Sequence, residues 1–123
     1  NVLAFFELPN QQDMGRDENT PKWVQHLAFR VGSEEELLAA KAHIEGEGVD
    51  VLGPTHHGIF KSIYFFDPNG HRVELAADIG TDERYAELKR VAPLMLDEWS
   101  KTKKAPRHAD WLHDLARQEH TKA

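Results

Sequence analysis

The sequence predicts an α+β protein in which a β-α-β-β-β module is followed by a helical extension. Two observations support this prediction. Short segments rich in alternating, β-branched or aromatic residues lie on both sides of one segment whose apolar residues recur at helical spacing. After Asp78 the apolar residues instead recur at intervals of three and four, which is typical of amphipathic helices.

The first predicted element is a strand over residues 1–8, where Asn1 is followed by the apolar run VLAFFEL and Pro9 ends the strand. The polar residues 10–20, closed by Pro21, are typical of a loop. Because the chain opens directly on a strand, we expect it to be a fragment whose upstream part holds another strand-rich module.

The compact module is predicted to begin at residue 21, with a strand over residues 23–31. Ser33 and the three glutamates that follow it form a capping box, which predicts the start of a helix. The apolar residues of this helix lie at helical spacing: Leu37, Ala40 and Ile44. Gly46 and Gly48 are expected to end it.

Three further strands are predicted after this helix. Residues 49–52 form a short strand, and Gly53-Pro54 reads as a turn. Residues 59–66 are rich in aromatic and β-branched side chains, which favours a longer strand. The sequence Asp-Pro-Asn-Gly at 67–70 is a turn signal, so residues 71–77 are predicted to return as the last strand.

The residues after the module are predicted to be helical. Apolar side chains at helical spacing mark a first helix, which Pro93 kinks or divides: Tyr85, Leu88, Ala92, Met95 and Trp99. After a lysine-rich link at 101–104, a last short helix carries Trp111, Leu112 and Leu115. We expect the large apolar residues of this tail to serve packing or dimer contact.

Composition limits the function classes. The 123 residues can bury one core, and a net charge of −6 argues against a nucleic-acid partner. No apolar stretch approaches the length of about 20 residues that a membrane span needs. There is no cysteine, so a transition metal would have to be held by imidazole and carboxylate groups. The chain start does not resemble a signal peptide, which makes the cytoplasm the expected compartment.

Strand alternation places two candidate ligands on one face. His26 points away from Leu27 and Phe29, and Glu74 points away from Val73 and Leu75. Because the 33–48 helix must cover the apolar sides, His26 and Glu74 are predicted to share the uncovered face.

Tyr64 is predicted to look onto the same face. One histidine, one glutamate and a further ligand suit Fe(II), Mn(II), Ni(II) or Zn(II), with coordination positions left for substrate.

Spacing alone leaves ordinary structural roles open. A single histidine in a strand is more often packed or solvated than bound to a metal, and Glu74 alone is no stronger a signal. The remaining histidines lie in settings where ordinary solvated polarity is the expected role: His43, His56, His57, His71, His108, His113 and His120.

Two segments carry a family resemblance. QHLAFRV at 25–31 and SIYFFDPNGHRVEL at 62–75 resemble the signature strands of the glyoxalase, bleomycin resistance and extradiol dioxygenase superfamily, also called the vicinal oxygen chelate superfamily. The Asp-Pro-Asn-Gly turn followed four residues later by Glu74 is the most specific part. The resemblance covers residues 21–78 and implies that His26 and Glu74 are metal ligands.

In that family two modules pair edge to edge into a cupped mixed sheet that holds the metal. The resemblance therefore divides the chain into the last strand of a preceding module with its linker (1–20), the metal-binding module (21–78) and a helical extension (79–123). Glu7 would then occupy the place that Glu74 holds in its own module. A solvent-facing glutamate on an edge strand is the alternative for Glu7.

The resemblance favours extradiol dioxygenase chemistry. Those enzymes hold Fe(II) with two histidines and one glutamate and bind a catecholic substrate beside dioxygen, so His26 and Glu74 would be two of three ligands. Tyr64 and His57 lie near the places of a tyrosine and an acid-base histidine in those enzymes. His57 is closer to Tyr64 in sequence than the family pattern has it, which weakens the assignment of a catalytic role.

Other chemistries of the family remain alternatives. A glyoxalase I-like lyase or isomerase would use four ligands, which Glu7, His26 and Glu74 fit in part. Epoxide opening of the fosfomycin resistance type matches the segment 62–65, although no oxyanion-binding loop is evident. A metal-free drug-binding protein would leave His26 and Glu74 unused. In each case we expect a small-molecule substrate, and an incomplete site that needs a homodimer or the upstream module.

Overall fold

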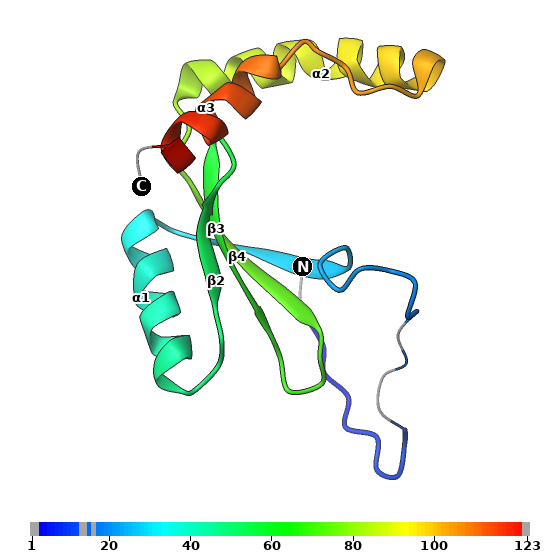
Figure 1. The fold of residues 1–123 in the computed structure, drawn as a ribbon, viewed down its shortest axis with the longest axis vertical. Coiled ribbons are helices and arrows are strands. Elements are labelled where there is room, and N and C mark those ends of the chain that lie inside the picture. Colours follow the sequence, from blue (N-terminus) through cyan, green and yellow to red (C-terminus); the bar gives the residue numbers. More distant parts are fainter. Residues whose placement is uncertain (1–2, 13–14, 16, 122–123) are drawn as a thin grey trace.

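The computed structural model describes residues 3–12, 15 and 17–121. Its elements follow one another in the order that the sequence predicts (Figure 1). They are β1 (His26–Val31), α1 (Glu34–Gly46), β2 (Leu52–His56), β3 (Phe60–Phe66), β4 (Arg72–Asp78), α2 (Asp82–Thr102) and α3 (Asp110–Thr121). The β-α-β-β-β order with C-terminal helices is confirmed.

The four strands form one mixed sheet in the order β1-β4-β3-β2. Strand β1 runs parallel to β4, and the other neighbours are antiparallel. A parallel pair needs a crossover connection, and α1 begins that connection. The predicted fold class, an α+β module of the glyoxalase and dioxygenase type, is confirmed.

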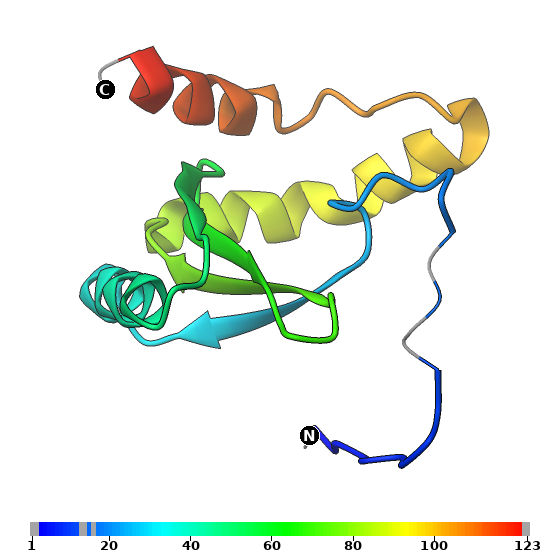
Figure 2. The same cartoon turned by 60° about the horizontal axis from the view of Figure 1, so that its bottom comes forward.

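Helix α1 covers one face of the sheet (Figures 1 and 2). The core under it is formed by Leu37 of α1, Ile63 of β3 and Ala77 of β4, which are fully buried. Other apolar side chains pack around these three: Val31, Ala40, Ile44, Val51 and Leu75. The helix therefore lies on the face to which Ile63, Leu75 and Ala77 point, as strand alternation predicts.

The start of α1 is capped as the sequence predicts, with one difference. The Ser33 hydroxyl accepts a hydrogen bond from the Glu36 backbone N–H at 3.2 Å. The Glu36 carboxylate accepts one from the N–H of Gly32 at 2.7 Å, one residue before the cap itself. Glutamates in the first turn also face the positive end of the helix dipole.

Two strand boundaries differ from the prediction. Strand β1 begins at His26 rather than at residue 23, because residues 21–24 form a turn in which the Val24 N–H donates to the Pro21 carbonyl at 3.0 Å. Strand β2 lies at 52–56, so the predicted turn at Gly53-Pro54 falls inside a strand. Proline has no backbone N–H to donate to a neighbouring strand. Strand β2 can accommodate it because β2 lies at the edge of the sheet.

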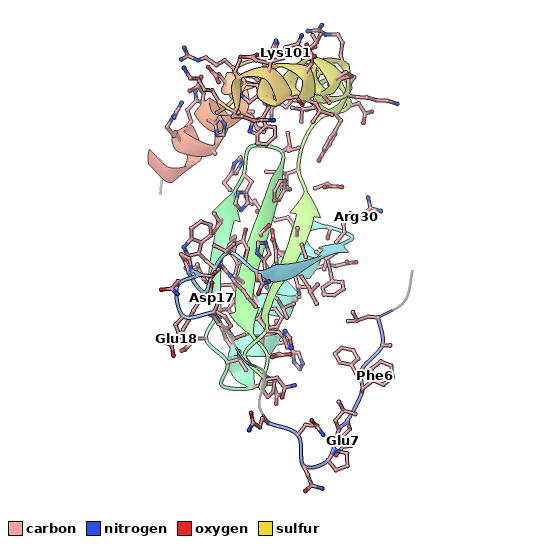
Figure 3. All side chains as sticks on the ribbon, turned by 90° about the vertical axis from the view of Figure 1, so that its right-hand side faces the viewer. Phe6, Glu7, Asp17, Glu18, Arg30 and Lys101 are labelled. Carbon is pink, nitrogen blue, oxygen red and sulfur yellow. The ribbon has the colours of Figure 1, made fainter. Side chains whose placement is uncertain are left out.

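The predicted strand at 1–8 does not form over its described part. Residues 3–8 extend away from the sheet, with Phe5 and Phe6 about 85% and 84% exposed (Figures 1 and 3). Residues 1 and 2 lie outside the described range. A strand needs a hydrogen-bonded neighbour, and among the described residues none pairs with this segment. Its assignment to a preceding module stays a prediction.

Helices α2 and α3 lie at the end of the sheet that carries the loop between β2 and β3 (Figure 1). The Tyr85 hydroxyl of α2 donates to the Ile59 carbonyl at 2.9 Å. Leu112 of α3 approaches Gly58 so closely that a Cβ there would lie 2.7 Å from its Cδ1 atom. Helix α2 continues through Pro93 and is not divided. No helix in the described ranges is both long and apolar enough to cross a membrane.

Candidate metal centre

The face of the sheet opposite α1 brings the predicted ligands together. In the ladder, Glu74 of β4 lies opposite Tyr64 of β3 and opposite Ala28 of β1. His26 is two residues before Ala28, so its side chain points to the same face.

His26 and Glu74 are in direct contact. The Nε2 atom of His26 lies 2.8 Å from Oε2 of Glu74, and the two side chains are 30% and 7% exposed. On its other side, Nδ1 of His26 is 3.3 Å from the Val24 carbonyl oxygen. In the structure the 2.8 Å contact is made by Nε2–H donating to Oε2 of Glu74. A histidine ligand would instead carry its proton on Nδ1, donate it to the Val24 carbonyl and direct the Nε2 lone pair at a metal ion.

The second oxygen of Glu74 is held by two hydroxyl groups. Ser62 Oγ donates to Oε1 at 2.5 Å, and the Tyr64 hydroxyl donates to the same atom at 3.2 Å. Ser62 is fully buried. Ser62 was not among the candidate site residues that the sequence predicted. The signal that could have found it is its position two residues from Tyr64, on the same face of β3.

His57 joins the same network from the loop between β2 and β3. Its Nε2 atom is 2.8 Å from the Tyr64 hydroxyl oxygen, and its ring stacks on Phe60 with 4.7 Å between centroids. Burial, followed by the negative charge of Glu74, raises the pKa of Tyr64 above its ordinary value. The phenol therefore remains protonated at neutral pH and can donate a hydrogen bond to Glu74.

Glu7, the third predicted ligand, is not brought to this face. It is exposed, and Figure 3 shows it on the N-terminal segment away from the sheet. Within the described part of the chain, no group of three or more histidine, aspartate or glutamate side chains is arranged to hold a metal ion. Of the three predicted ligands, only His26 and Glu74 are brought together, and we call this pair the half-site. That they bind a metal stays a prediction.

The half-site fits a divalent metal. Two ligand atoms that each lie about 2.1 Å from a metal ion, with an angle of about 90° between the two bonds, are about 3 Å apart. The His26 Nε2 and Glu74 Oε2 atoms are 2.8 Å apart. An imidazole nitrogen with a carboxylate oxygen is the donor set of a facial triad that lacks one histidine.

Comparison with known proteins identifies the family. The model of the Glyoxalase/Bleomycin resistance protein/Dioxygenase superfamily matches residues 1–75. The chain belongs to this superfamily. The match includes both segments on which the resemblance was based, together with the N-terminal segment.

Two curated relatives of this superfamily member are dioxygenases by name. The putative ring-cleaving dioxygenase MhqA of Bacillus subtilis is 36% identical over 71% of this chain and 28% of its own length. Biphenyl-2,3-diol 1,2-dioxygenase 3 of Rhodococcus globerulus is 33% identical over 52% of this chain and 35% of its own length. The chain therefore spans about a third or less of these relatives.

A solved structure is also similar. The fosfomycin resistance protein FosX of Listeria monocytogenes, in complex with Mn(II) and sulfate, is 34% identical over 63% of this chain and 59% of its own. The TM-score of 0.41 is too low to support a functional argument.

Proposed function

We propose that this chain is the metal-binding module of an extradiol-type dioxygenase that cleaves a catecholic ring with Fe(II). His26 and Glu74 are two of the three protein ligands in this proposal. The observation that supports it most strongly is the 2.8 Å contact between His26 Nε2 and Glu74 Oε2. Tyr64 and His57 lie directly behind this pair, and two relatives are dioxygenases by name.

The residues of the half-site have distinct parts in the proposal. When bound, Fe(II) supplies adjacent positions for the two catechol oxygens and for dioxygen. The Val24 carbonyl orients the His26 ring, and Ser62 and Tyr64 hold Glu74 Oε1, so that Oε2 keeps its place beside His26. His57, within reach of the Tyr64 hydroxyl, is the acid-base group that takes a proton from a catechol hydroxyl.

The third ligand comes from outside the described residues in this proposal. Its source is the last strands of an upstream module, to which residues 1–20 are assigned as final strand and linker, or a second copy of the chain. Strand β1 is an edge of the sheet, so its outer side can pair with such a partner.

Oxygen uptake tests the proposed reaction. The protein in its natural full length is loaded anaerobically with Fe(II) and mixed with catechol and dioxygen. We expect the wild type to consume oxygen and to form a ring-opened product. His26→Ala and Glu74→Gln should lose both activities. The control variant His43→Ala changes an exposed histidine of α1 and should keep them. Absence of ring opening in the loaded wild type would contradict the proposal.

The glyoxalase I-like alternative is less well supported. It needs a carboxylate ligand from each module, and Glu7, the candidate for the second carboxylate, lies exposed and apart from the sheet. Isomerisation of a hemithioacetal without oxygen uptake would favour it nevertheless.

A further inference from the structure

Arg72 occupies a position on the metal-binding face that the proposed reaction has not used. It begins β4, where it pairs with His26 on one side and Phe66 on the other. It lies two residues before Glu74 and therefore points to the same face. Its guanidinium carbon is 4.4 Å from the centroid of the Tyr64 ring, so the cation is stacked on the ring whose hydroxyl holds Glu74.

The charge of Arg72 is not balanced by a carboxylate within the described part of the chain. Four other arginines have a carboxylate partner within 4 Å: Arg30, Arg90, Arg107 and Arg117. Glu74 is close to Arg72 in sequence, but its two oxygens are engaged by His26, Ser62 and Tyr64. The planar donors of the guanidinium are thus available to an external anion.

Two clefts border this face, and Arg72 and Lys22 line both of them. The first cleft also contains His26, and the second has Tyr64 beside the large apolar side chains of Trp23 and Phe66. The two cations therefore lie between the ligand histidine and an aromatic wall.

Three carboxylates also line these clefts, namely Asp17, Glu45 and Asp50. Asp17 accepts hydrogen bonds from Asn19 and Thr20, and Glu45 pairs with Lys41. Asp50 is exposed and, among the described residues, makes no ion pair with Arg72, nor do the other two.

We infer that Arg72, supported by Lys22, is a specificity-determining residue that binds an acidic substituent on the aromatic substrate. A carboxylate accepts two parallel hydrogen bonds from a guanidinium, while the ring rests against Trp23 and Phe66. The preferred substrates are then catechols that carry a carboxylate rather than uncharged ones. This inference rests on the proposed ring-cleavage function for the catechol part of the substrate, and the subsite itself is tested by binding.

Binding to the metal-free protein of natural full length is the test. Titration calorimetry compares protocatechuate, which carries a carboxylate, with catechol, which has the same dihydroxy ring without it. We expect the wild type to bind protocatechuate about 10-fold or more tightly than catechol, because only protocatechuate has a carboxylate that can accept charge-assisted hydrogen bonds from Arg72. Arg72→Gln should abolish this preference and leave catechol affinity within about threefold. Arg90→Gln, on α2, is the matched control and should keep the preference.

The outcomes separate this inference from the proposed function. Equal affinities in the wild type, or an equal loss for both ligands in Arg72→Gln, would overturn the subsite. If the Fe(II)-loaded protein takes up no oxygen but the preference depends on Arg72, the subsite stands and ring cleavage fails. In the last outcome the Fe(II)-loaded wild type cleaves protocatechuate and catechol with equal kcat/KM, and Arg72→Gln changes neither value. Ring cleavage then stands and the subsite is refuted.

Discussion

Removal of the Ser62 hydroxyl is the most informative perturbation of the half-site. Ser62 is fully buried and donates at 2.5 Å to Oε1 of Glu74, whose side chain is only 7% exposed. Ser62→Ala leaves that oxygen with the longer Tyr64 contact of 3.2 Å. A hydrogen bond to a charged group contributes about 1.5 to 3 kcal/mol, and water has little access to replace this one. We therefore expect the free energy of unfolding to fall by about 2 kcal/mol.

Urea unfolding of the metal-free protein measures this change, with circular dichroism as the signal. Ser100→Ala, at an exposed position of α2, is the matched control and should alter stability by no more than about 0.5 kcal/mol. If Ser62→Ala and Ser100→Ala unfold at the same urea concentration, the Ser62 hydroxyl does not stabilise the buried carboxylate, and its place in the half-site is refuted.

Two further predictions concern the scaffold. Ser33→Ala removes the cap of α1 and should lower the free energy of unfolding by about 1 kcal/mol, measured in urea; an unchanged midpoint would show that the cap is not stabilising. Burial and the charge of Asp78 raise the pKa of Tyr85, so its contribution to stability is complete below pH about 10 and is lost as the pH rises through the raised pKa. Tyr85→Phe should show a smaller alkaline loss of stability than the wild type, and an equal loss at every pH would contradict this reasoning.

Strand alternation predicted the faces of the sheet well because a period of two is fixed by backbone geometry. It placed His26, Glu74 and Tyr64 on one face, and the ladder register brings the first two into contact. The role of Ser62 was missed because alternation gives the direction of a side chain and not its partner. Likewise, nothing local in the sequence indicates that Arg72 stacks on Tyr64.

The errors arose where long-range pairing decides local structure. Gly53-Pro54 has the composition of a turn, but the edge position of β2 lets proline sit in a strand. Residues 1–8 have the composition of a strand, yet the described residues 3–8 have no neighbouring strand to complete the hydrogen bonds. The same absence leaves Glu7 away from the face where His26 and Glu74 meet.

Equilibrium binding of Fe(II) under anaerobic conditions tests the central claim most directly. The protein in its natural full length is compared with His26→Ala, Glu74→Gln and the control His43→Ala, and bound iron is quantified after dialysis. We predict saturable binding in the wild type and in His43→Ala, and its loss in each of the two ligand variants. Equal iron binding by all four proteins would contradict the assignment of His26 and Glu74 as ligands.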